Sequence, residues 1–148
     1  MKNILVGIED CEATTIASPL LQRAIELATA FAGKVWLVHV VRRVGEPPFD
    51  FQRSNLRRAV AEAYRHEREF LHHLEQGLRD RGVEAGSLLV EGSPTAALIE
   101  ECAHLHGDLI IVGCYRHGTT YSALLEPTEE GLVSKCRCPM MFVPLPAE

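Results

Sequence analysis

The chain has 148 residues, 47% of them hydrophobic, which is enough apolar material for one domain with a real core. Its net charge of −5 and pI of about 5.8 argue against nucleic acid and anionic membranes as main partners. No apolar run approaches a membrane span, and Met1 leads directly into a strand pattern without a signal peptide. We therefore expect a single cytoplasmic domain over residues 1–148.

The predicted elements alternate between strand and helix along the chain. Short continuous apolar runs are typical of parallel strands covered on both faces, and they occur at 4–8, 35–41, 87–90, 109–112 and 140–143. Apolar residues at helical spacing predict helices over 18–32 and 54–81, one beginning at Ser93-Pro94, and one after Glu126. We expect Gly33 and Gly82 to end the first two helices, and 42–53 to form a loop.

This βαβαβαβαβ order, with right-handed crossovers, predicts one parallel sheet with helices on both faces. In such doubly wound α/β folds, phosphate-bearing ligands usually sit beyond the carboxyl ends of the strands, against a helix N-terminus. Here the last helix begins with Glu126-Pro127 and continues with Glu129 and Glu130. Three carboxylates and a proline make that helix start unfavourable for an anion.

The cysteines and histidines give no metal or redox motif. Five scattered cysteines form no disulfide framework, and Cys136-Arg137-Cys138 lacks the Cys-x-x-Cys spacing. We expect these cysteines to be small residues that pack beside the sheet. Cys114 is the one thiol to test for reactivity, because it follows a strand end. His39 is expected to be a hydrogen-bonded sheet residue rather than a ligand, and His66 and His73 lie too far apart on one helix for a shared metal.

Two polar segments leave alternatives open. Glu9 and Asp10 follow the first strand. The two alternatives for this pair are that it caps a turn or that it binds Mg²⁺, and we favour the turn. Arg116 and His117 precede Gly118 and Thr119 in a segment that we interpret as a solvated polar loop. One histidine beside one arginine does not make up a group of catalytic residues.

Five segments, in this order and at these separations, resemble the universal stress protein family over nearly the whole chain. They are Ile4-Leu5-Val6 followed by an acidic residue, Leu37–Val41, Val90-Glu91-Gly92-Ser93-Pro94, Asp108–Gly113, and Cys138-Pro139 before a strand ending in Val143-Pro144. The resemblance implies a Rossmann-like sheet of order 3-2-1-4-5, similar to adenine nucleotide alpha hydrolases. It also implies a stress-response homodimer joined through the last strand, here Met140, Phe142 and Val143.

Many members of that family bind ATP through a Gly-x2-Gly-x9-Gly-Ser/Thr motif, and others lack the motif. In this chain the first glycine matches Gly113, but the other three positions fall on Arg116, Glu126 and Pro127. Arg116 disfavours positive φ, Pro127 removes an N–H donor, and the glutamates would repel a triphosphate. Arg116 and His117 would offset part of that repulsion, or Arg116 would pair with Glu126, and Mg²⁺ could bridge carboxylates to phosphates.

The resemblance therefore implies a non-enzymatic signalling dimer that acts through protein partners, without ordinary ATP binding and with no expected cofactor. The alternatives are an adenine-nucleotide sensor for ATP or AMP, with Mg²⁺, and a slow nucleotide hydrolase. If a nucleotide binds, the residues expected around it are Glu9, Val40, Val41, Gly113, Arg116, His117, Gly118 and Thr128.

Overall fold

The computed structural model describes residues 2–9, 14–41, 53–114 and 136–145, with side chains of the long second helix described from residue 64 onward. Five strands form one sheet of order β3-β2-β1-β4-β5, and every neighbouring pair is parallel. This confirms the predicted doubly wound α/β fold and its strand order. The predicted loop at 42–52 and the predicted helix after Glu126 lie outside the described residues.

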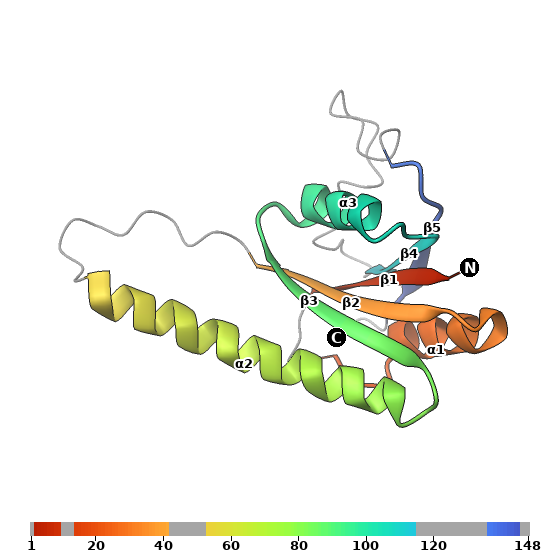
Figure 1. Ribbon diagram of the computed structural model, residues 1–148, viewed down its shortest axis with the longest axis horizontal. Helices are drawn as coiled ribbons and strands as arrows, with labels where there is room; N and C mark the ends of the chain where they lie inside the picture. The colour runs from red at the N-terminus through yellow and green to blue at the C-terminus, as the bar shows by residue number, and fades with distance from the viewer. Residues whose placement is uncertain (1, 10–13, 42–52, 115–135, 146–148) are drawn as a thin grey trace.

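The bounds of the elements follow the chain in order. The strands are β1 (Asn3–Ile8), β2 (Lys34–Val41), β3 (Glu84–Glu91), β4 (Leu109–Cys114) and β5 (Met140–Pro144). The helices are α1 (Pro19–Phe31), α2 (Arg53–Arg79) and α3 (Pro94–His104). Helices α1 and α2 lie on one side of the sheet and α3 on the other, as Figure 1 shows.

Alternate residues of the strands supply two apolar layers. On the side of α1 and α2, Ile4, Val6 and Leu37 pack with helix residues such as Leu21 and Leu74. On the side of α3, the second layer consists of Leu5, Val38, Val40, Ala97, Leu98, Cys102, Ile110 and Val112. Because both faces are covered, the central strands are apolar without alternation, as parallel strands require.

The ends of the helices show where sequence signals were read correctly and where they were not. Ser18 caps α1, its Oγ accepting the N–H of Leu21 at 3.4 Å, and Gly82 has the positive φ of +77° expected after α2. Gly33 was expected to end a helix over 18–32, but α1 ends at Phe31 and its C-cap is Ala32. Ala32 takes the left-handed conformation, with φ 53°, and Gly33 then donates its N–H to the Ala28 carbonyl at 3.0 Å.

Two further expectations needed correction. Strand β3 begins at Glu84 rather than Ser87, because Glu84, Ala85 and Gly86 pair with Lys34, Val35 and Trp36 of β2 despite their weak strand propensity. Ser93 precedes Pro94 at the start of α3, as expected, but its side chain makes no capping hydrogen bond. No helix in the described part of the chain is long and apolar enough to cross a membrane.

Candidate functional site

The carboxyl ends of β1, β2 and β4 lie side by side, because β1 sits between the other two strands. Ile8 pairs with His39 of β2, and Gly7 pairs with Val112 of β4. Glu9 follows β1, Val40 and Val41 end β2, and Gly113 lies near the end of β4. The structure therefore brings four of the predicted nucleotide-site residues to one edge, at the point where strand order reverses. The other four, Arg116, His117, Gly118 and Thr128, lie outside the described residues.

Glu9 and the end of β2 form one part of this edge. Glu9 is half-buried, with one carboxylate oxygen fully shielded from solvent. The Val40 side chain is buried on the α3 side of the sheet, whereas Val41 is half-buried. The carbonyl of Val41 accepts the N–H of Gly92 at 2.9 Å, which ties the end of β2 to the turn after β3. The polar backbone of Val41 is thus already partly engaged within the protein.

Gly113 is packed against Leu145, which follows β5. A Cβ added to Gly113 would lie 2.4 Å from Leu145 Cδ1 and 3.2 Å from Leu145 Cγ. Leu145 is held there by its own N–H, which donates to the Cys114 carbonyl at 2.9 Å. The packing of Leu145 therefore requires a residue without a side chain at position 113.

A buried histidine lies on the α2 side of the same edge. His39 is 6% exposed; its Nδ1 lies 2.7 Å from the Ile8 carbonyl oxygen, and its Nε2 contacts the Glu67 carboxylate of α2. The prediction of a hydrogen-bonded sheet histidine is confirmed. Because both ring nitrogens face oxygen partners, this imidazole has no free nitrogen to serve as a base or a metal ligand.

Negative charge gathers beside that histidine. The Tyr64 hydroxyl of α2 donates to Glu91 Oε1 at 3.3 Å, at the end of β3. Partial burial, together with the charges of Glu91 and Glu67, raises the pKa of the Tyr64 phenol. With Glu9 after β1, carboxylates from three elements lie along this edge, so a nearby phosphate would be repelled.

Cysteine and histidine side chains elsewhere were predicted only in part. The rings of His66 and Phe70 meet edge to face on α2, and His73 is exposed. Within residues that the structure describes, no group of three or more potential ligands could hold a metal ion. Cys102 is buried, as expected for a packing residue, but the sequence analysis missed that Cys138, 36 positions later, lies beside it. The spacing of residues in the sequence does not predict such a tertiary contact.

Comparison with known proteins agrees with this architecture. A family model described as the universal stress protein family matches residues 1–144. A protein of that family from Burkholderia pseudomallei is 26% identical with a TM-score of 0.67, over 97% of this chain and 96% of that chain. Among curated proteins, none matches the chain significantly.

Two less similar structures share the fold and carry nucleotides. The universal stress protein from Archaeoglobus fulgidus in complex with dAMP is 17% identical, with a TM-score of 0.63 over 97% of this chain and 98% of that one. A universal stress protein family member from Arabidopsis thaliana with AMP bound is 19% identical, with a TM-score of 0.54 over 99% and 93%. With the sheet order observed and the family match spanning 144 of 148 positions, this chain belongs to the universal stress protein family.

Proposed function

We propose that this protein is a non-enzymatic stress-response protein of the cytoplasm that signals through protein partners and does not bind ATP in the way its family motif provides. The observation that carries the proposal is the packing of Leu145 against Gly113, the one motif position that the sequence retains. The packing of Leu145 explains why position 113 is a glycine, because a side chain there would collide with Leu145. No bound ligand is needed to explain this glycine. A retained glycine is then no sign of a retained phosphate site.

The sequence and the charges of the edge support the same proposal. Three small residues of the motif are replaced here by Arg116, Glu126 and Pro127. Arg116 reduces backbone freedom, Pro127 removes an N–H donor, and Glu126 weakens the electrostatic attraction for a phosphate. Glu67 and Glu91 add negative charge at the neighbouring strand ends. His39, fixed between Ile8 and Glu67, is not available for proton transfer, which favours a non-enzymatic role.

The proposed assembly is a homodimer formed through β5. This strand is last in the sheet order, with β4 on one side, so its other edge can pair with a second copy. Met140 and Phe142 are half-buried and could complete their burial there. The side chain of Val143 is only 6% exposed, so its part in the dimer would be limited to its backbone. Native mass spectrometry of freshly purified protein would report both the subunit number and any retained small molecule.

A second candidate is an adenine-nucleotide sensor with an altered phosphate loop. It is favoured by two structural neighbours, whose structures contain dAMP and AMP, which have a single phosphate. A nucleotide with one phosphate would need fewer contacts with the altered phosphate loop than ATP, which has three phosphates. Titration with ATP, ADP and AMP, each with and without Mg²⁺, separates the candidates. Micromolar AMP binding without ATP binding would replace the first proposal with the second, and no binding of any of the three would support the first.

A further inference from the structure

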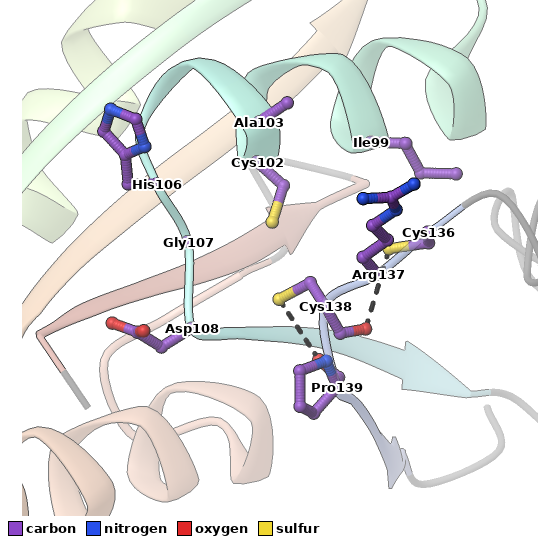
Figure 2. Close-up of a pocket in the computed structure, with 10 residues that line it drawn as sticks. All are labelled: Ile99, Cys102, Ala103, His106, Gly107, Asp108, Cys136, Arg137, Cys138 and Pro139. Atoms are coloured by element: carbon purple, nitrogen blue, oxygen red, sulfur yellow. Dashed lines mark hydrogen bonds between the residues drawn. The ribbon is translucent and has the colours of Figure 1, made fainter.

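A cavity of about 830 Å³ opens at the amino edge of the sheet, at the opposite ends of the strands from the candidate site. It lies between the end of α3, the turn before β4 and the segment before β5, as Figure 2 shows. The groups with chemistry in its lining are Cys102, His106, Asp108, Cys136, Arg137 and Cys138. None of these residues belongs to the nucleotide motif, so the cavity is independent of the proposed function.

Two of the three thiols face one another across this cavity. In Figure 2 the Cys102 sulfur is directed toward the Cys138 sulfur, and the two lie close enough for each thiol to affect the pKa of the other, while Cys138 Sγ donates to the Pro139 carbonyl at 3.5 Å. Cys102 Sγ packs closely against Gly107, where an added Cβ would lie only 2.6 Å from the sulfur. Cys136 is turned differently, because its thiol donates to the Cys138 carbonyl at 3.6 Å.

We propose that Cys102 and Cys138 are an oxidation site, at which hydrogen peroxide converts the thiol pair to a disulfide that links α3 to the segment before β5. In the first step, the Cys102 thiolate attacks one peroxide oxygen, the O–O bond breaks, and hydroxide leaves and takes up a proton to become water. In the second step, the Cys138 sulfur attacks the resulting sulfenic acid, and a second water leaves. The pair loses two electrons and two protons, and the peroxide is reduced to two waters.

The burial and hydrogen bonding of the two thiols indicate which one attacks the peroxide first. Burial raises the pKa of both thiols, and the neighbouring Cys138 thiol and the Gly107 backbone lower that of Cys102 in part. The Cys138 thiol donates to the Pro139 carbonyl at 3.5 Å, so we assign the first attack to Cys102 and the second to Cys138. The charges facing the pair are Asp108 and Cys136, which disfavour a thiolate, with Arg137 and His106 as the basic groups of the cavity. Since both pKa values are raised, oxidation is slow near neutral pH and accelerates as pH rises.

The linkage has a measurable consequence for stability. The disulfide would close a loop from residue 102 to residue 138 and thereby restrict the unfolded chain. For an unstrained bridge of this length in a domain of this size, Tm should rise by about 10 °C after oxidation. Reduction with dithiothreitol should return Tm to its original value.

The test is peroxide treatment of the full chain, followed by alkylation of the remaining thiols and peptide mapping without reduction. The proposal expects one intramolecular bridge, Cys102–Cys138, that is lost in Cys102→Ser and in Cys138→Ser and kept in the matched controls Cys136→Ser and Cys114→Ser. A bridge mapped to Cys136, or sulfinic acid at Cys102 without any bridge, would overturn it.

A second measurement uses the unmodified protein, in case a serine variant fails to fold. Phenylarsine oxide links two thiols only when their sulfurs are adjacent. The folded, reduced protein should bind one equivalent, with the arsenic mapped to Cys102 and Cys138, and should then resist peroxide bridging. Failure of the reagent to bind, while a small alkylating agent still modifies both cysteines, would also overturn the proposal.

Discussion

Glu67 of α2 places a carboxylate oxygen against Nε2 of His39, a buried residue of β2 whose Nδ1 lies 2.7 Å from the Ile8 carbonyl oxygen. The contact joins the middle of α2 to the carboxyl edge of the sheet. Replacing His39 by Ala should therefore destabilise the protein by about 2 kcal/mol, because a buried carbonyl and a partly buried carboxylate both lose their partner. Urea denaturation followed by circular dichroism measures this loss.

The matched variant for this pair is Glu67→Gln. A glutamine amide can donate to a neutral imidazole, so this change keeps one hydrogen bond and should cost less than about 1 kcal/mol. Equal losses in the two variants would contradict this expectation, because they would show that an amide at position 67 cannot replace the carboxylate as the partner of His39.

A second prediction concerns the acid stability of the sheet. Asp108 Oδ2 accepts the backbone N–H groups of Lys2 at 2.7 Å and Asn3 at 2.9 Å. These bonds lower the pKa of Asp108 below its usual value. The stabilisation is therefore fully present above the unfolded pKa of about 3.9 and is lost as pH falls from there through the lower folded pKa.

Asp108→Asn should cost about 1 kcal/mol at neutral pH, a low figure because Asp108 is exposed and solvent screens the charge. The difference from the parent should shrink as pH falls below about 4, where the parent carboxylate also protonates. Asp80→Asn is the control, since Asp80 accepts from the Gln76 side chain rather than from β1. A difference that stays constant down to the acid transition would contradict this account.

A third prediction tests whether Gly113 is retained for packing. Gly113→Ala should destabilise the protein by about 1 kcal/mol, because its Cβ would displace the half-buried Leu145. Adding Leu145→Ala removes the collision, so the double variant should be no less stable than Leu145→Ala alone. The coupling is read from a double-mutant cycle of urea midpoints. Additive losses would mean that Gly113 is required for a reason other than Leu145.

Gly107→Ala offers a comparison at the other edge of the sheet. There the added Cβ would lie 2.6 Å from Cys102 Sγ and 2.8 Å from Cδ1 of the fully buried Leu5. Because both neighbours are buried, whereas Leu145 is only half-buried, this change should cost about 2 kcal/mol, more than Gly113→Ala. The same denaturation series measures both variants.

The parallel sheet with helices on both faces was predictable because apolar runs such as Leu109–Val112 are typical of strands buried on both faces and crossovers are right-handed. The strand order 3-2-1-4-5 was expected from the resemblance to the universal stress protein family. Local backbone choices were less predictable. Ala32, rather than Gly33, takes the left-handed conformation at the end of α1. Residues 84–86 join β3 because the ladder with β2 outweighs their own weak preference for strand.

The candidate site was predictable only where the family motif or strand ends could place it, as for Glu9 and Gly113. The packing of Leu145 on Gly113, the Glu67–His39 contact and the Cys102–Cys138 pair join residues far apart in sequence. Such contacts depend on how a helix or a chain end packs on the sheet, and no residue spacing encodes them. The sequence alone therefore could not place these three contacts.

We propose that Arg116, Glu126 and Pro127, at three positions of the family motif, disable ATP binding in this domain. Isothermal titration of ATP with Mg²⁺ into the parent and into the triple variant Arg116→Gly, Glu126→Gly, Pro127→Ser tests it most directly. The variant restores backbone freedom, an N–H donor and a less negative helix start, so it should bind ATP in the micromolar range while the parent shows no such binding. Micromolar ATP binding by the parent, or a variant that binds no better than the parent, would contradict the claim.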